Sequence, residues 1–118
     1  MELLRRSYRK GRTIAAAAVR TRSGRLFRGV NIEGLYTPCA EPVAIGAAFA
    51  ATERELSAMV AVGRRGRRFA LLAPCGTCRQ RLLDHAPEAY AIVPDRRGRP
   101  VRLAARASLP YAFTTFGR

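Results

Sequence analysis

Residues 37–46 read TPCAEPVAIG, and they place a cysteine two residues before a glutamate at the start of an alanine-rich stretch. Small and apolar side chains recur at helical spacing from Cys39 to about Glu55. This periodicity predicts a helix that packs closely on its neighbours through alanines. Cys39 would begin the helix, and Glu41 would lie in its first turn.

Strand and helix patterns alternate on both sides of this segment. Residues 13–21 and 25–31 are joined by Arg22-Ser23-Gly24, which predicts an antiparallel hairpin. Other expected elements are a short basic helix within residues 1–10, strands at 58–62, 89–93 and 101–103, a further apolar run at 69–73, and a helix from Cys75 to about Asp84. The order predicts an α/β fold, with helices packed on a mixed five-stranded sheet, in a single domain over residues 1–118.

Composition limits the class of protein. Of the 118 residues, 48% are hydrophobic, which favours a folded domain. No apolar run reaches the roughly 18 residues needed to cross a bilayer, and the first residues, MELLRRSYRK, lack the apolar stretch of a secretory signal. Three cysteines fit reduced thiols or metal ligands better than a disulfide framework. We therefore expect a cytoplasmic protein without a membrane partner.

The formal charge is +14, and Lys10 is the only lysine. Arginine runs at residues 64–68 and 96–99 could contact phosphates. Both runs surround a glycine, where exposed turns are expected, and the joint abundance of arginine, alanine, glycine and proline is typical of a biased genome. We therefore interpret the runs as solvated turns and do not expect nucleic-acid binding as the main function.

A second motif, APCGTCRQ at residues 73–80, contains Cys75 and Cys78 at the start of the second expected helix. This spacing places two sulfurs within reach of one ion, and a helix N-terminus favours their thiolate forms. Cys39 is the third candidate ligand. Three thiolates leave one open position, which is typical of a catalytic zinc. His85 could close the site, but it would lie about 10 Å along the helix from Cys78, so we interpret it as a helix C-terminal residue.

Glu41 has two interpretations. A glutamate in the first turn of a helix complements the helix dipole. Beside a three-cysteine cluster, its carboxylate can also face the open coordination position without being a ligand. There it can accept a proton from metal-activated water and pass it on. We favour the second interpretation.

The C-A-E trio at residues 39–41 and the P-C-G-T-C segment at 74–78 resemble the zinc-dependent cytidine deaminase superfamily, and the resemblance extends over residues 13–113. It implies a three-layer α/β/α fold and an attack of metal-activated water on C4 of cytosine, with release of ammonia. It also implies that Cys39, Cys75 and Cys78 hold one zinc ion and that Glu41 is the proton shuttle. With Cys39 as the first ligand, the chain resembles the small homotetrameric enzymes of this superfamily that act on free nucleosides.

Motifs of the sequence resemble two branches of the superfamily. Asn31-Ile32-Glu33 resembles the segment with which cytidine deaminases bind ribose hydroxyls, and LPYAF at 109–113 resembles their C-terminal motif. Its phenylalanine, here Phe113, would reach the active site of a neighbouring subunit. Ala40 is a further substrate-binding position. Conversely, the P-C-A-E segment, the sequence PCGTCRQRLLD and the short connection between residues 31 and 39 resemble blasticidin-S deaminase.

The expected substrate is therefore a free cytosine nucleoside, cytidine or deoxycytidine. The alternative within the same chemistry is a cytosine nucleoside antibiotic such as blasticidin S. From another class, the alternative is a non-catalytic, zinc-stapled, basic nucleic-acid-binding protein.

The chain also departs from both patterns. Pro42 occupies the position of an arginine in many three-cysteine cytidine deaminases, and Thr77 that of an arginine in blasticidin-S deaminase. Arg79 is placed to offset the thiolate charge instead, although an arginine at this position could equally be structural. The aromatic residue that packs the pyrimidine in cytidine deaminases aligns with residue 13 or with Ile14, and Tyr36 could replace it.

Overall fold

A computed structural model of the chain describes residues 1–35 and 38–114. Within these residues, no helix is both long and apolar enough to cross a membrane. The elements in chain order are α1 (Glu2–Ser7), β1 (Ala15–Thr21), β2 (Leu26–Val30), α2 (Ala40–Ala50), β3 (Leu56–Arg65), β4 (Arg68–Leu72), α3 (Gly76–His85), β5 (Tyr90–Pro94), β6 (Pro100–Ala104) and α4 (Ala105–Ser108).

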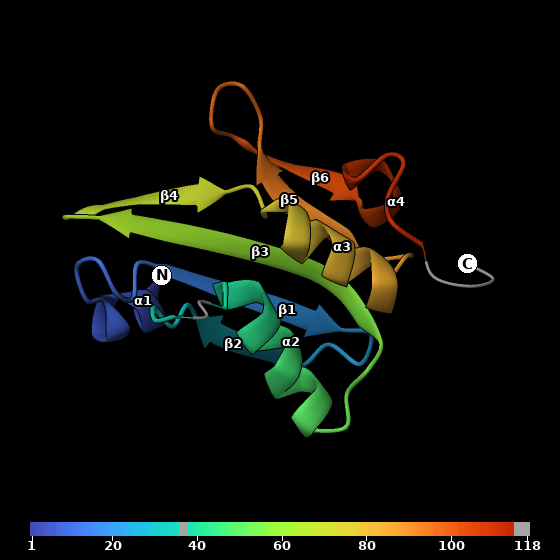
Figure 1. The fold of residues 1–118 in the computed structure, drawn as a ribbon, viewed down its shortest axis with the longest axis horizontal. Helices are drawn as coiled ribbons and strands as arrows, with labels where there is room; N and C mark the ends of the chain where they lie inside the picture. Colours follow the sequence, from blue (N-terminus) through green and yellow to red (C-terminus); the bar gives the residue numbers. More distant parts are fainter. Residues whose placement is uncertain (36–37, 115–118) are drawn as a thin grey trace.

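The strands form one mixed sheet in the order β2-β1-β3-β5-β6, with β4 paired to the far half of β3 (Figure 1). β3 and β5 are parallel, whereas the other pairs are antiparallel. The predicted hairpin at residues 13–31 and the mixed sheet are confirmed. The sheet has six strands in place of the five expected. The difference is β4, formed by the apolar run before Pro74, which pairs with residues 61–65 of β3.

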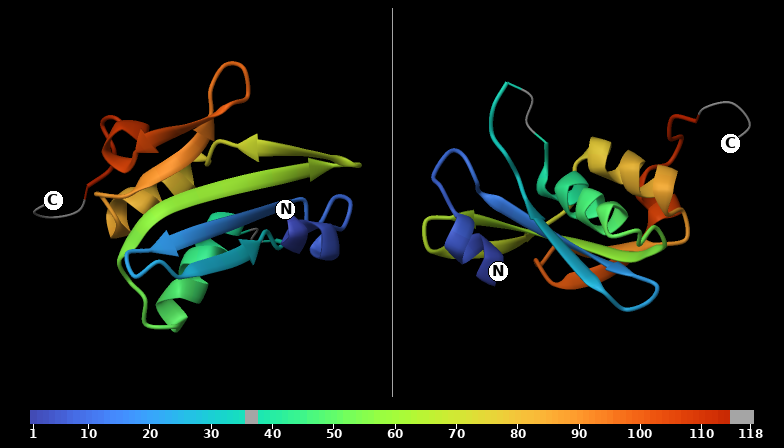
Figure 2. Two further views of the ribbon diagram at one scale, coloured as in Figure 1. Left: turned by 180° about the vertical axis from the view of Figure 1, so that it is seen from behind. Right: turned by 90° about the horizontal axis from the view of Figure 1, so that it is seen from below.

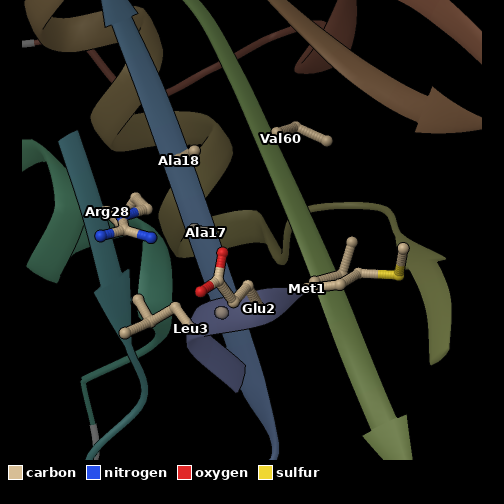
Figure 3. A pocket seen from close by; sticks show the side chains of 9 residues that line it. Met1, Glu2, Leu3, Ala17, Ala18, Arg28 and Val60 are labelled. Atoms are coloured by element: carbon tan, nitrogen blue, oxygen red, sulfur yellow. The ribbon is translucent and has the colours of Figure 1, made fainter. Parts of the chain in front are cut away.

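Helices lie on both faces of the sheet, two on one face and the short α1 on the other. α2 and α3 lie side by side on one face (Figure 2). Ala17 and Val19 of β1 belong to the core under these helices. On the other face, the first turn of α1 lies over β1 and β3, while α3 passes behind the sheet (Figure 3). A cavity of about 170 Å³ separates α1 from Ala18 and Val60, and it is on the side away from α2 and α3.

α2 ends at Ala50, about five residues before the predicted end. The chain turns sharply there to enter β3, and Thr52 adopts the left-handed conformation with φ of 63°. The N–H of Glu53 returns to the Ala48 carbonyl at 2.9 Å. No glycine or proline stands between Ala50 and β3, so the sequence has no local signal that locates the end of the helix. α3 matches its predicted range within one residue.

α2 lies unusually close to β2, because small residues face each other across the contact. Ala40, Ala44 and Ala48 recur every four residues on α2 and are at most 1% exposed. Opposite them, Gly29 is in β2. A β-carbon at residue 29 would lie 2.5 Å from the Ala44 nitrogen and 2.9 Å from the Ala40 oxygen. The absence of a side chain at Gly29 therefore allows the close approach that positions the N-terminus of α2.

We expect Gly29→Ala to lower the free energy of unfolding by about 3 kcal/mol, because the added methyl meets helix backbone, which cannot rotate away. Gly46→Ala is the matched control. Residue 46 is an exposed position of α2 with open space around its α-carbon, so alanine should stabilise the protein by about 0.5–1 kcal/mol. Urea unfolding of both variants measures the difference. A loss below about 0.5 kcal/mol in Gly29→Ala would mean that the helix contact is loose.

Candidate active site

Three thiols meet where α2 and α3 begin. Cys39 and Cys75 are the N-caps of the two helices, and Cys78 is in the first turn of α3. The sulfurs of Cys39 and Cys75 are 3.6 Å apart, those of Cys75 and Cys78 are 3.3 Å apart, and all three lie within 4.8 Å of one another. In a tetrahedral site with zinc to sulfur bonds of about 2.3 Å, the sulfurs are about 3.8 Å apart. The cluster therefore fits one zinc ion.

The three thiols differ in environment. Cys78 is fully buried, and burial strongly raises the pKa of its thiol. Burial, followed by the hydrogen bond with Cys75, also raises the pKa of Cys39. The pKa of Cys75 is lowered, because hydrogen bonds from Cys78 and Cys39 outweigh the opposing effect of burial. In the metal-free protein, Cys75 is therefore the first of the three to ionise.

Helix N-termini supply positive charge to the cluster. The backbone N–H of Cys78 donates to the Cys75 sulfur at 3.4 Å, and α2 begins immediately after Cys39. Pro42 is the third residue of α2, where a backbone N–H has no partner within the helix, so the proline costs no hydrogen bond. Thr77 is exposed. The helix dipoles thus favour thiolates where an arginine was expected.

Arg79 holds the surrounding chain. Its guanidinium donates to the Pro74 carbonyl at 2.9 Å and to the Ser108 carbonyl at 3.0 Å. These bonds tie the segment before Cys75 to α4. Ser108 was not singled out in the sequence, and its distance of 29 residues from Arg79 left no local pattern by which to find it. The geometry supports a structural role for Arg79 rather than direct contact with sulfur.

Glu41 brings a carboxylate to the thiols. Its side chain lies in the first turn of α2 and is 6% exposed. After burial and hydrogen bonding, its negative charge also raises the pKa of Cys39, Cys75 and Cys78, so the carboxylate is close to the whole cluster. Among the described residues, no hydrogen bond or ion pair uses the Glu41 carboxylate. The site thus combines a metal-binding cluster with an adjacent acid whose oxygens can accept protons.

Asn31 and Glu33 follow β2 in the chain, and Asn31 lies beside the start of β1. The Oδ1 of Asn31 accepts from the N–H groups of Ile14 and Ala15, both at 2.9 Å. Its Nδ2 donates to the Arg12 carbonyl at 3.0 Å and to Glu33 Oε1 at 3.1 Å. The amide of Asn31 has two donor hydrogens and two acceptor lone pairs, so all four are used within the chain. Asn31 therefore anchors the N-terminal end of β1 and orients Glu33.

Asn31→Ala should lower the free energy of unfolding by about 2–4 kcal/mol, because Asn31 is 6% exposed and its loss leaves two backbone N–H groups without their acceptor. Asn31→Asp restores the acceptor but not the donor to Glu33, and it places two carboxylates together. Thermal unfolding of the two variants measures these effects. Wild-type stability in Asn31→Ala would show that the hydrogen bonds of Asn31 do not contribute to the free energy of unfolding.

The remaining predicted residues lie around this centre. Ala40 is 1% exposed, so only its backbone can meet a ligand. Phe113 is 70% exposed, and its carbonyl accepts from Gln80 Nε2 at 2.9 Å. Ile14 is 41% exposed beside Asn31. Tyr36, the proposed substitute for the pyrimidine-packing residue, lies outside the described residues. His85 ends α3 with its ring against Phe49, at 5.4 Å between centroids, as predicted for a residue outside the metal cluster.

Comparisons with known proteins agree with this geometry. The family model described as "Cytidine and deoxycytidylate deaminase zinc-binding region" matches residues 1–93. Blasticidin-S deaminase from Bacillus cereus is 30% identical over 115 residues, which cover 91% of this chain and 81% of the relative. Cytidine deaminase from Mycobacterium tuberculosis is 35% identical over 105 residues, covering 86% and 74%. The crystal structure of cytidine deaminase from Burkholderia pseudomallei has a TM-score of 0.71 at 32% identity, covering 86% and 82%.

The chain belongs to the cytidine and deoxycytidylate deaminase family. It is a hydrolytic deaminase of cytosine compounds, and zinc is its cofactor. The cluster of Cys39, Cys75 and Cys78 could hold one such ion. The resemblance drawn from the two cysteine motifs and the predicted α/β fold are thereby confirmed.

Proposed function

We propose that this protein hydrolyses the exocyclic amine of cytosine in a free nucleoside, cytidine or deoxycytidine, to give the uracil nucleoside and ammonia. The observation that carries the proposal is the placement of the buried Glu41 carboxylate beside three thiols at two helix N-termini. A single domain over residues 1–118 would contain all of these groups. Because zinc binding needs reduced thiols, we place the protein in the cytoplasm.

Each residue has a chemical role in this proposal. Cys39, Cys75 and Cys78 hold the metal as thiolates. When bound there, zinc is a Lewis acid that activates water for attack on the cytosine ring. Glu41 accepts the two protons of the attacking water in turn, and it delivers one to ring N3 and the other to the leaving amine. The low exposure of Glu41 keeps bulk water from competing for these protons.

Substrate binding is proposed for the polar end of β1. Glu33 accepts hydrogen bonds from the ribose hydroxyls, and Asn31, whose own groups are already paired, holds that carboxylate in place. The backbone of Ala40 at the N-terminus of α2 contacts the base. A site that pairs sugar hydroxyls in this way discriminates against analogues that lack them.

Phe113 supports a shared active site. Its ring is 70% exposed although its backbone is fixed by Gln80, so the residue is presented to a neighbour at a defined position. We propose a homotetramer in which Phe113 completes the site of another subunit. A sizing measurement that found a fully active monomer would contradict this assembly.

Blasticidin S is the second candidate substrate. The relative that deaminates it matches 91% of the chain. In addition, residue 13 or Ile14 aligns with the aromatic residue that packs the pyrimidine in cytidine deaminases, and the smaller side chain at this position supports space for a bulkier substrate. The bulkier antibiotic would use this space.

Turnover of three cytosine compounds distinguishes these candidate functions. Zinc-loaded protein is mixed with cytidine, deoxycytidine or blasticidin S, and loss of the cytosine absorbance band is followed. We expect cytidine and deoxycytidine to be the better substrates. Preference for blasticidin S would establish the second candidate. No turnover of any of the three, together with salt-dependent nucleic-acid binding, would favour a non-catalytic zinc protein.

The role of Glu33 is tested in the same assay. Glu33→Ala should raise KM for cytidine by roughly 10- to 100-fold, because it removes charge-assisted hydrogen bonds, and should leave the zinc content unchanged. The neighbouring side chain of Ile32 is 57% exposed, so Ile32→Ala is the control and should keep the wild-type KM. An unchanged KM in Glu33→Ala would remove this residue from substrate binding.

A further inference from the structure

Cationic side chains are concentrated at one end of the molecule, which also includes Arg12, whose carbonyl accepts from the Asn31 amide. Residues 5–12 contain five of the 22 arginines and lysines, and residues 64–68 contain four more. The first segment is α1 with the turn after it, and the second is the tip of the β3–β4 hairpin. All the ribbon views place α1 and this tip at the same end (Figures 1 and 2). We call these two segments the basic end.

Direct contacts hold the two segments together. The Arg64 guanidinium lies 4.4 Å from the centroid of the Tyr8 ring and 5.4 Å from that of Phe69. Arg5 of α1 also lies over Phe69, at 5.2 Å. The N–H of Arg64 donates to the Ile14 carbonyl at 2.8 Å. The basic end is therefore a packed surface rather than two separate turns.

Within the described residues, no ion pair neutralises the positive charge of the basic end. Among the described residues, the ion pairs use arginines elsewhere, namely Arg22, Arg25, Arg99 and Arg106. Residues 1–12 and 64–68 contain a single acidic residue, Glu2, which borders the cavity under α1 (Figure 3). In contrast, the other arginine run has Asp95 paired with Arg99 at 2.9 Å.

The hairpin tip also places like charges face to face. Arg65 and Arg68 are directly opposite in the register of β3 and β4, an arrangement that destabilises a sheet. Both side chains are exposed, as is Arg67 in the turn. Gly66 adopts φ of 62° in this turn, so the tip is sharply folded and brings the arginines close together. Folding alone does not favour such a cluster, whereas a polyanion would offset the repulsion.

We propose that the basic end binds the phosphate backbone of nucleic acid, without reading its bases, as an activity separate from deamination. Eight of its nine cations are arginine, whose planar guanidinium matches phosphate oxygens bidentately. The rings of Tyr8 and Phe69 are covered by guanidinium groups, so they are not free to stack on bases. Recognition therefore rests on phosphate charge.

The distribution of the cations favours nucleic acid over a membrane surface. Side chains alternate between the two faces of a strand, so Arg64, which contacts α1, lies on the face opposite to Arg65 and Arg68. A flat bilayer meets one face of the hairpin at a time. A nucleic-acid backbone can contact both faces of the tip.

Fluorescence anisotropy with a labelled DNA duplex of about 20 base pairs tests the proposal, at salt concentrations from about 50 to 200 mM. The full-length, zinc-loaded protein should bind with a strongly negative slope of log affinity against log salt concentration. Arg67→Ala/Arg68→Ala should weaken binding about tenfold or more and make the slope shallower by about 1–2, since two phosphate contacts are lost. Deaminase activity should be unchanged, which shows that the variant is folded.

Arg96→Ala/Arg97→Ala is the matched control, because it also removes two adjacent exposed arginines beside a glycine with positive φ. It should bind DNA within about twofold of wild type. An equal loss in both variants would show that binding reflects net charge and would overturn the proposal. It would also be overturned by an absence of DNA binding at about 50 mM salt, or by binding to phosphatidylserine vesicles but not to DNA.

Discussion

Replacing Glu41 by glutamine should lower kcat/KM for cytosine nucleosides by about 10²- to 10⁴-fold, the usual contribution of a positioned general acid or base. Glutamine keeps the shape of the side chain. Among the described residues, Glu41 makes no hydrogen bond that glutamine would break, and its 6% exposure leaves little solvent to replace it in proton transfer. The loss should therefore come from the chemical step, with a small change in KM.

Zinc content distinguishes a proton shuttle from a ligand. If only the three cysteines bind the metal, Glu41→Gln should retain one zinc per chain. The carboxylate raises the pKa of all three thiols, so its neutralisation should let them ionise at lower pH. The variant should then retain zinc to a lower pH than the wild type, as a chromogenic chelator can measure. Loss of zinc at neutral pH would mean that Glu41 is a ligand.

Glu88→Gln is the control for the loss of one carboxylate. Glu88 is an exposed residue paired with Arg106 at 2.7 Å, away from the cysteine cluster. Its replacement should change activity by less than about twofold. If Glu41→Gln kept more than a tenth of the wild-type activity, the proton-transfer assignment would be wrong.

Local sequence patterns predicted the two helix starts at this site, because helix starts have short-range signals. The cysteines at residues 39 and 75 are N-caps, and Glu41 lies in the first turn of α2, as the two motifs indicated. The glycine at residue 66 also marked a turn correctly. Such features depend on a few neighbouring residues, so they can be read from spacing.

Long-range contacts could not be predicted in this way. The amide of Asn31 bonds to residues 16 and 17 positions earlier, so its clamp on β1 has no local signature. Likewise, Arg79 binds Ser108 across 29 positions. The arginine run at 64–68 predicts a turn, and nothing in the run indicates that α1 packs beside it. These contacts arise only when the sheet brings distant segments together.

Cys78→Ser should abolish zinc binding and deamination, the second large effect that we expect. Cys78 is fully buried between the helix starts, so no solvent molecule or other side chain can take its place as a ligand. Zinc joins α2 to α3, and a ligand present at about 1,000 times its Kd stabilises the native state by about 4 kcal/mol. The wild type should therefore show a higher Tm with zinc than without it, and Cys78→Ser should show no such difference.

Proton release gives this prediction a second, independent readout. Burial raises the pKa of Cys78 and of Cys39, so in the metal-free protein both thiols remain protonated at neutral pH, and zinc must displace their protons. Affinity for zinc should then fall by about tenfold per pH unit for each displaced proton, or about 100-fold for two. Stabilisation by zinc should therefore be present at higher pH and be lost as the pH falls, because protons compete with zinc for the sulfurs.

Titration of metal-free protein with zinc chloride in weakly buffered solution at neutral pH measures this release. We expect about two protons per zinc from Cys39 and Cys78, with a smaller contribution from Cys75, whose pKa is lowered. Cys75→Ser serves as comparison, since its exposed side chain can be changed with less effect on packing than that of Cys78. It should lose zinc binding while keeping the metal-free stability of the wild type. Two results would exclude the three-thiolate site: retention of zinc by Cys78→Ser, or zinc binding that does not depend on pH near neutrality. The reason is that zinc bound by these three thiolates must displace the protons of Cys39 and Cys78 and must link α2 to α3.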